Sequence, residues 1–284
     1  MPAQAAFAEH PSVQVEPPQF EATAGWDDNI TRAAEASSRL GDRMLSIALS
    51  RGVTAALGPH TRVLVGAFAS AEKMSRFDGL DRLSGGLTAQ LQLRPSAAFA
   101  APTFAVFTDL QRDEYRSSPR SGTRFAGGAS VRQSWTDRID AFAAFTASRS
   151  NARGSVFDQG ERGLRAHVDY AAPGHGTFYA GAEMRRGDVV STTLGFSDEY
   201  ARIARANGPD EAFGPGFHAY RLAGRTNILT LGWSLPLDAK RALDFAWRRV
   251  LSSAPIPADA ESAYGAETLK YRSNLFTASC LLRF

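Results

Sequence analysis

The sequence predicts an all-β protein, and more specifically a twelve-stranded antiparallel up-and-down transmembrane β-barrel. Three observations support this prediction. Apolar and polar residues alternate with a period of two in twelve segments, short and long connections alternate between these segments, and the last segment is apolar at every second position. We therefore expect a flexible tail over residues 1–17 and an outer-membrane barrel over residues 18–284.

The overall composition is compatible with such a barrel. The chain has 284 residues, of which 44% are hydrophobic, and its net charge of +3 argues against a nucleic-acid partner. The single cysteine excludes an internal disulfide and a multi-cysteine zinc site. No run reaches the ~18 apolar residues that a membrane helix needs. A mean hydropathy of −0.23 still suits a barrel, because apolar residues at alternate positions are enough to coat its outside.

The first segment of the chain is expected to lie outside the barrel. Residues 1–17 lack the basic and apolar regions of a complete signal peptide, although Ala6, Phe7 and Ala8 resemble the small-residue end of a cleavage site. Two interpretations follow: an export signal that lies upstream of Met1, or a flexible tail.

Period-two alternation is typical of strands with one apolar face. In the first strand, for example, Phe20, Ala22, Ala24 and Trp26 share a face. Alternation leaves the faces ambiguous in 62–72 and 138–148. The predicted strands lie near residues 20–26, 45–50, 62–72, 87–94, 104–111, 124–132, 138–148, 164–170, 178–185, 229–235, 243–248 and 276–284.

The connections alternate strictly in length. A soluble β-sandwich has the same alternation of side chains, but several of these strands run to about 10–14 residues, which suits a tilted membrane span better than the ~5–6 of globular strands. Short turns are then periplasmic and long loops external, with both termini on the short-turn side. The short connections are 58–61, 96–101, 136–137, 173–176 and 238–240, and the long ones are 27–42, 73–84, 113–122, 149–162, 186–219 and 252–268.

The C-terminal strand ends in an alternating apolar pattern that closes on an aromatic residue. Its members are Phe276, Ala278, Cys280, Leu282 and Phe284. This pattern resembles the terminal insertion signal of Gram-negative outer-membrane β-barrel proteins, which the barrel assembly machinery recognises. The resemblance implies a location in the outer membrane of a Gram-negative bacterium, with outer-membrane lipids, lipopolysaccharide and the assembly machinery as partners. Cys280 is then expected to face lipid as a small apolar residue.

A second resemblance concerns the end of the first strand. Gly25, Trp26, Asp27, Asp28, Asn29 and Ile30 are similar to the opening of many proteobacterial barrels, including the surface lipoprotein assembly modifier family. The similarity is confined to the barrel. It implies a periplasmic or surface protein as a possible partner.

The polar faces of the predicted strands would line the lumen, where rings of charged side chains set the selectivity of a pore. Arginine dominates the basic residues, and a surplus of arginine would favour anionic solutes. The preferred alternative is a self-neutralising network of ion pairs that keeps the lumen hydrated. The candidates for the pore lining are Arg94, Asp109, Arg124, Arg132, Arg165, His167, Asp169, Glu183, Arg185, Asp244 and Arg248.

The function expected from these features is a pore or transporter for small polar or anionic solutes. The alternative is a barrel that anchors or threads a partner protein or polymer, and an outer-membrane hydrolase is the third possibility. Catalysis would centre on His167, but no serine partner or nucleophile motif accompanies it. We therefore expect no enzyme activity and no cofactor. We also expect no metal site, because Asp27, Asp28 and Asn29 lack the spacing of a calcium loop.

The external loops carry two further signals. Ser197 can cap a short helix over 197–206, ended by Asn207 and Gly208. This helix either folds inward as a constriction or, as we expect, lies outside the lumen in a mobile lid. Arg116, Arg120 and Arg124 are either solvated or in contact with lipid phosphates.

Overall fold

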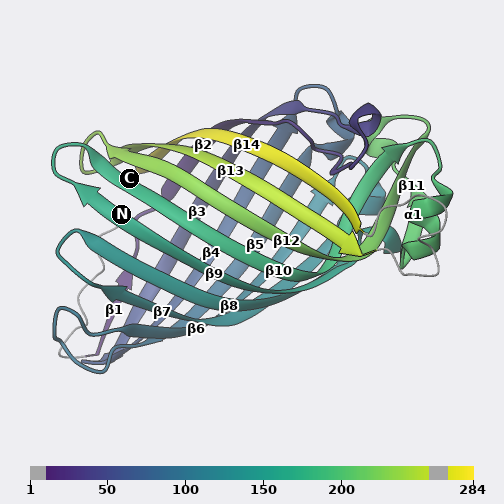
Figure 1. Cartoon of the computed structure of the whole chain (residues 1–284). Helices are drawn as coiled ribbons and strands as arrows, with labels where there is room; N and C mark the ends of the chain where they lie inside the picture. The colour runs from purple at the N-terminus through teal and green to yellow at the C-terminus, as the bar shows by residue number, and fades with distance from the viewer. Residues whose placement is uncertain (1–10, 256–267) are drawn as a thin grey trace.

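The computed structural model describes residues 11–255 and 268–284, and it forms a closed antiparallel barrel (Figure 1). The prediction of a twelve-stranded barrel is confirmed, since each strand pairs with the next along the chain and the last pairs with the first. The barrel strands are β2 (Gln19–Asp27), β3 (Asp42–Gly58), β4 (Thr61–Met74), β5 (Arg82–Leu93), β6 (Thr103–Tyr115), β7 (Gly122–Ser134), β8 (Ile139–Ala152), β9 (Gln159–Ala172), β10 (Gly176–Leu194), β12 (Phe217–Pro236), β13 (Arg241–Pro255) and β14 (Thr268–Arg283).

The barrel closes where β14 meets β2. The pairing runs from Leu275 opposite Asp27 to Arg283 opposite Gln19, as the sequence predicts. On the outer face Trp26 stacks on Phe276 with ring centroids 6.0 Å apart. Closure satisfies the backbone groups of both edge strands, which an open sheet would leave unpaired in hydrocarbon.

Side-chain exposure alternates along the strands and identifies the two faces. In β3 the aliphatic residues Leu45, Ile47 and Leu49 are half exposed, whereas the intervening serines and alanines are less accessible. The same alternation resolves the two ambiguous strands. Val65 and Phe145 point outward, so that Phe142 lies on the inward face of β8. The aliphatic band faces outward all round the barrel, which is the arrangement that lipid requires.

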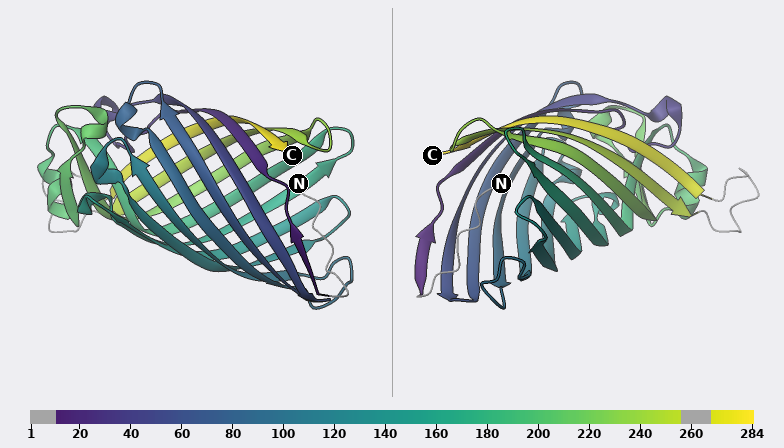
Figure 2. Two further views of the ribbon diagram at one scale, coloured as in Figure 1. Left: turned by 180° about the vertical axis from the view of Figure 1, so that it is seen from behind. Right: turned by 60° about the vertical axis from the view of Figure 1, so that its left-hand side comes forward.

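The N-terminal segment is more ordered than its sequence suggests. Residues 12–15 lie in the segment expected to be a flexible tail, but they form β1 (Ser12–Val15), which pairs with Val53–Ala56 of β3. Pro17 and Pro18 separate β1 from β2, because proline lacks the N–H that would continue the ladder. Ala6, Phe7 and Ala8 lie outside the described residues. Figure 2 shows β1 and the C-terminal end of β14 at the end of the barrel that carries the short turns.

The predicted loop over 186–219 is wrong in its extent. β10 and β12 pair continuously from Thr177 opposite Ser234 to Leu194 opposite Phe217, so the sheet extends well past the predicted end of each strand. Only residues 195–216 connect the two strands. They hold α1 (Asp198–Ile203), β11 (Ala206–Pro209) and the 3-10 helix η5 (Glu211–Phe213). The other short 3-10 helices are η1 (Ala36–Ser38), η2 (Asp78–Leu80), η3 (Ser118–Arg120) and η4 (Ser155–Phe157).

The predicted helix begins where expected and ends early. The Ser197 hydroxyl accepts a hydrogen bond from the backbone N–H of Tyr200 at 3.4 Å, which caps α1. Asn207 and Gly208 do not end the helix but belong to β11, which pairs with β12. None of the helices in residues 11–255 and 268–284 is long and apolar enough to cross a membrane.

Candidate functional site: the barrel interior and its extracellular cap

The strand alternation places the predicted pore-lining residues inside the barrel, with one exception at its mouth. Arg94 follows β5 in a short turn, where its guanidinium donates to the carbonyl oxygens of Ala98 and Phe99. It therefore belongs to the periplasmic mouth. The residues on the inward faces of β6 to β13 are Asp109, Arg124, Arg132, Arg165, His167, Asp169, Glu183, Arg185, Asp244 and Arg248.

Arginines in the extracellular half of the lumen are paired with carboxylates. Arg185 donates through Nε to Glu183 Oε1 at 2.7 Å and lies 3.4 Å from Glu161 Oε1. Arg124 reaches the same Glu161 carboxylate at 3.5 Å. This part of the wall is the self-neutralising network that was the alternative to an anion path.

A second network lies on the adjoining strands β4, β5 and β6 and contains residues that sequence reasoning missed. Arg82 lies 3.3 Å from Glu72 Oε2 and 3.9 Å from Asp113 Oδ1. Arg82 and Asp113 fall inside the predicted loops 73–84 and 113–122, and their side chains were therefore not assigned to the lumen. Extending the alternation of β5 and β6 by a few positions would have found them.

On one stretch of the wall, two arginines make no direct ion pair with a described carboxylate, although Asp109 interacts electrostatically with one of them, Arg165. Arg132 lies on β7, Phe142 on β8 and Arg165 on β9. The guanidinium carbons of the two arginines lie 5.7 Å and 5.2 Å from the centre of the Phe142 ring. His167 packs on the same ring at 5.7 Å. Among the described residues no acidic side chain comes within ion-pair distance of either arginine. We call these four residues the arginine–aromatic wall.

His167 makes a contact that positions it but adds no nucleophile. Its Nε2 lies 2.8 Å from Asp169 Oδ2, on the next inward position of β9. Among the described residues, no serine or cysteine side chain hydrogen bonds with His167. A histidine needs a nucleophile or substrate within hydrogen-bond reach to act as a general base.

Tyr179 on β10 was not among the predicted pore-lining residues, but its side chain extends along the lumen wall across β12 to β13. Tyr179 donates to Asp244 Oδ1 at 2.9 Å, and its ring lies flat over Gly232 on the strand between them. A Cβ at Gly232 would stand 2.1 Å from Tyr179 Cζ, so only glycine permits this path. Tyr179 was predicted on the polar face of its strand, and its reach to Asp244 is visible only in the folded barrel.

The extracellular mouth is covered by packed loops, which we call the cap: residues 28–41, 75–81, 116–121, 153–158 and 195–216. The first loop reaches across to β10, where Thr192 donates its N–H to the carbonyl oxygen of Thr31 at 2.8 Å. Phe77 packs on Phe213 with ring centroids 5.4 Å apart. Most of the fully buried side chains gather at this end of the barrel. The segment 195–216 is therefore packed rather than a mobile lid.

Arg120 holds three parts of the cap together. It donates through Nε to Asp210 Oδ1 at 3.2 Å, and its guanidinium carbon lies 4.3 Å from the centre of the Phe157 ring. The Asp210 side chain is fully buried and also accepts from Thr192 Oγ1 at 2.7 Å. The expectation that Arg120 is solvated or meets lipid phosphates is therefore wrong. Of its predicted neighbours, Arg124 points into the lumen and Arg116 pairs with Asp78 at 2.8 Å.

Helix α1 packs into the cap through one tyrosine. Tyr200 is buried against Tyr220 on the inward face of β12 and donates to Glu35 Oε1 at 2.8 Å. Burial, followed by the Glu35 carboxylate, raises the pKa of the Tyr200 hydroxyl. The same two causes raise the pKa of Glu199. The helix lies at the extracellular tip of the barrel, where it contributes to the cap (Figure 1).

The acidic residues at the end of β2 are engaged with protein groups. Asp27 lies 2.7 Å from Arg32 and accepts from the Ser273 hydroxyl at 2.8 Å. Asp28 accepts from the side-chain amide of Asn274 at 2.7 Å. These bonds tie the first loop to β14.

No protein-family model matches the chain, and no curated protein matches it. Solved structures match it in fold. An outer membrane channel from Pseudomonas putida F1 is 10% identical with a TM-score of 0.55, over 95% of this chain and 96% of that chain. The NanC porin is 8% identical with a TM-score of 0.44, over 93% and 100% of the two chains. The translocator domain of the autotransporter NalP from Neisseria meningitidis is 11% identical with a TM-score of 0.38, over 94% and 88%. At these identities the similarity concerns the fold alone, and the chain has the fold of an outer-membrane β-barrel.

Proposed function

We propose that this protein is an outer-membrane channel for small polar solutes, and that the arginine–aromatic wall favours solutes with an anionic group. The observation that carries the proposal is the pair of guanidinium groups, on Arg132 and Arg165, that face the lumen and form no ion pair with any carboxylate of the described residues. A guanidinium presents a planar fork of donors that matches carboxylate and phosphate groups. Both groups pack on the Phe142 ring, which adds an apolar face to the same wall.

The outer surface supports a location in the outer membrane of a Gram-negative bacterium. Toward the short-turn end, Phe178 stacks on Trp233 and Trp233 on Phe245, with centroids 6.0 Å and 5.9 Å apart. Aromatic girdles of this kind flank the apolar band of membrane barrels. The cap favours small solutes over a threaded polymer, because segment 195–216 packs across the extracellular mouth.

Ion selectivity in planar bilayers tests this proposal. We expect the wild-type channel to prefer anions and the Arg132→Gln/Arg165→Gln variant to lose that preference, seen as a shift in reversal potential under a salt gradient. Arg149→Gln is the matched control, because Arg149 lies on β8 but points outward. The measurement is repeated in an Arg120→Ala background, in which the cap is loosened. A protein that forms no channel in either background, or a reversal potential that the double substitution leaves unchanged, would contradict the proposal.

A further inference from the structure

Three arginines form a row on the outer face of the barrel, at the extracellular end of the apolar band. Arg162 of β9 stands directly opposite Arg186 of β10, and Arg186 stands directly opposite Arg225 of β12. All three side chains are exposed. We call them the arginine row.

The described part of the chain supplies no counter-charge to the arginine row. Arg225 donates only to the Asn227 side chain, at 3.3 Å, and no described acidic residue forms an ion pair with any of the three. Asp188, the next outward residue of β10, is already bonded to Arg205 at 2.7 Å and to the Gly160 N–H at 2.8 Å. Like charges directly opposite one another destabilise a sheet. An external anion would remove that cost.

Other basic side chains extend the row along the same rim. Arg249 and Arg272, on β13 and β14, point outward and line a recess beside Asp28 and Arg39. Arg43, Lys73, Arg112 and Arg149 point outward near the same end of β3, β4, β6 and β8. Of these, Lys73 and Arg112 are paired with Asp81 and Glu114, so the unpaired positive charge of the described rim is densest at β9–β12.

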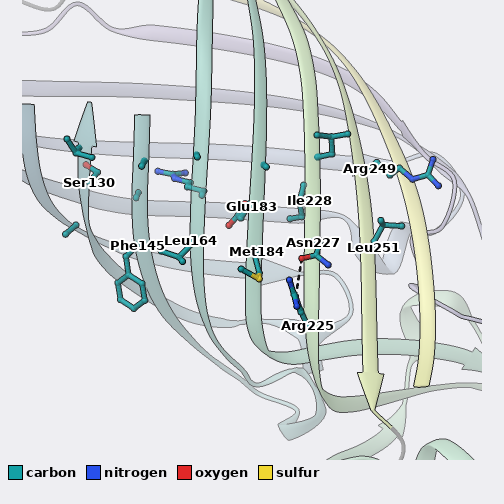
Figure 3. A pocket seen from close by; sticks show the side chains of 18 of the residues that line it. Ser130, Phe145, Leu164, Glu183, Met184, Arg225, Asn227, Ile228, Arg249 and Leu251 are labelled. Carbon is teal, nitrogen blue, oxygen red and sulfur yellow. Dashed lines mark hydrogen bonds between the residues drawn. The ribbon is translucent and has the colours of Figure 1, made fainter. Parts of the chain in front are cut away.

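An apolar hollow lies beside the arginine row on the same outer face. Figure 3 shows Phe145, Leu164 and Met184 on neighbouring strands, with Arg225 at the extracellular edge of the same surface. The hollow has a volume of about 910 Å³ and is lined mainly by apolar atoms. Leu164 and Met184 each lie one outward position from Arg162 and Arg186 along their strands. Along the membrane normal, the guanidinium groups of the arginine row therefore lie on the extracellular side of the apolar surface.

We propose that the arginine row and the apolar hollow together bind a phosphate-bearing lipid of the outer leaflet. The lipid phosphates accept charge-assisted hydrogen bonds from the guanidinium groups, and the acyl chains lie in the hollow. A soluble anion would bind the arginine row but leave the apolar hollow empty. A neutral lipid would fill the hollow but would not bind the arginine row. The proposal rests on the outer-membrane location and is independent of whether the barrel conducts ions.

Binding of lipid A by the purified full-length protein in detergent tests this inference, with native mass spectrometry as the readout. We expect saturable binding of diphosphorylated lipid A, and a loss of at least about tenfold in affinity in the Arg186→Gln/Arg225→Gln variant. The matched control is Arg112→Gln/Arg153→Gln. It removes the same charge from the extracellular rim, but there both arginines are paired with Glu114. The control should bind within about twofold of wild type.

Two further ligands separate the possible sources of the anion. Inorganic phosphate should not compete with lipid A at millimolar concentration, and dephosphorylated lipid A should bind no better to wild type than to the row variant. Equal losses in the row variant and its control, or full competition by inorganic phosphate, would overturn the proposal. Measuring conductance on the same variants keeps this result separate from the channel proposal, because removing outward arginines should leave selectivity unchanged.

Discussion

Arg120 and Asp210 form a buried ion pair that ties the loop between β6 and β7 to the segment between β10 and β12. The two residues are far apart in sequence, and Thr192 at the end of β10 shares the same carboxylate. The cap is therefore fastened at one point by a charge pair from which water is largely excluded.

Removing one partner of this pair should open the cap. Arg120→Ala leaves the Asp210 carboxylate buried without a cation, which costs about 3–5 kcal/mol for pairs of this kind. We expect faster cleavage within 195–216 by proteinase K and a larger single-channel conductance. Arg116→Ala is the control, because the Arg116–Asp78 pair is mostly exposed and contributes at most about 1 kcal/mol. Equal cleavage of the two variants would show that the pair does not hold the cap.

Gly232→Ala should destabilise the barrel by displacing Tyr179. The added methyl group overlaps the tyrosine ring and forces it away from Asp244, at a cost of about 1–3 kcal/mol for overpacking of this type. The measurement is the urea midpoint for unfolding in detergent micelles. In a Tyr179→Ala background, Gly232→Ala should cost much less stability, because the tyrosine ring that the added methyl group would overlap is absent. Strictly additive effects would mean that the close approach of Tyr179 is unimportant.

The packing of α1 should weaken as pH rises through the titration of Glu199. Burial and the Glu35 carboxylate raise the pKa of Glu199, so its charged form is disfavoured in the folded cap. The resulting penalty is absent below the ordinary pKa of a glutamate and is present in full above the raised pKa. Because Glu199 is partly exposed, we expect an effect below about 1 kcal/mol.

Hydrogen exchange of the α1 amides, corrected for intrinsic rates, measures this effect. Protection should be greater at pH 4 than at pH 7 in wild type, and Glu199→Gln should abolish most of the difference. A pH dependence that persists unchanged in Glu199→Gln would assign the titration to another group.

The C-terminal apolar pattern is predicted to act in assembly, and this stays a prediction of the sequence. Replacing Phe284 by alanine should lower the amount of protein in the outer membrane several-fold while leaving refolding in detergent nearly unchanged. Leu281→Ala is the control, because Leu281 is on the inward face of the same strand. Cell fractionation, paired with heat-modifiable migration on gels, distinguishes loss of assembly from loss of folding. Equal losses in the two variants would count against a lipid-facing signal.

The sequence predicts the barrel well because the information is local. In a strand such as β3, Leu45, Ile47 and Leu49 alternate with small residues, and this pattern identifies the lipid-facing side of the strand. Prediction fails at strand ends, where polar residues on both faces hide the alternation. Arg82 and Asp113 were lost to predicted loops for this reason, and β10 and β12 were cut short.

The candidate site is divided in the same way. Alternation by itself placed Arg132, Arg165 and His167 on the inward face, but Phe142 lay on a strand whose two faces have similar polarity. Whether an arginine is neutralised depends on its neighbours across the sheet. Arg185 pairs with Glu161 and Glu183, whereas Arg165 stands directly opposite Glu183 in the β9–β10 register and still has no carboxylate within ion-pair distance among the described residues.

The sequence alone determined the fold class, the closure of β14 on β2 and the face on which most side chains lie, since each follows from a period-two pattern and the need to satisfy every backbone group in lipid. Only the tertiary structure decided that Arg120 is buried against Asp210, that the loops form a cap, and that Arg162, Arg186 and Arg225 align in a row. These features depend on loop packing and on the register between strands, which bring together residues that no local pattern connects.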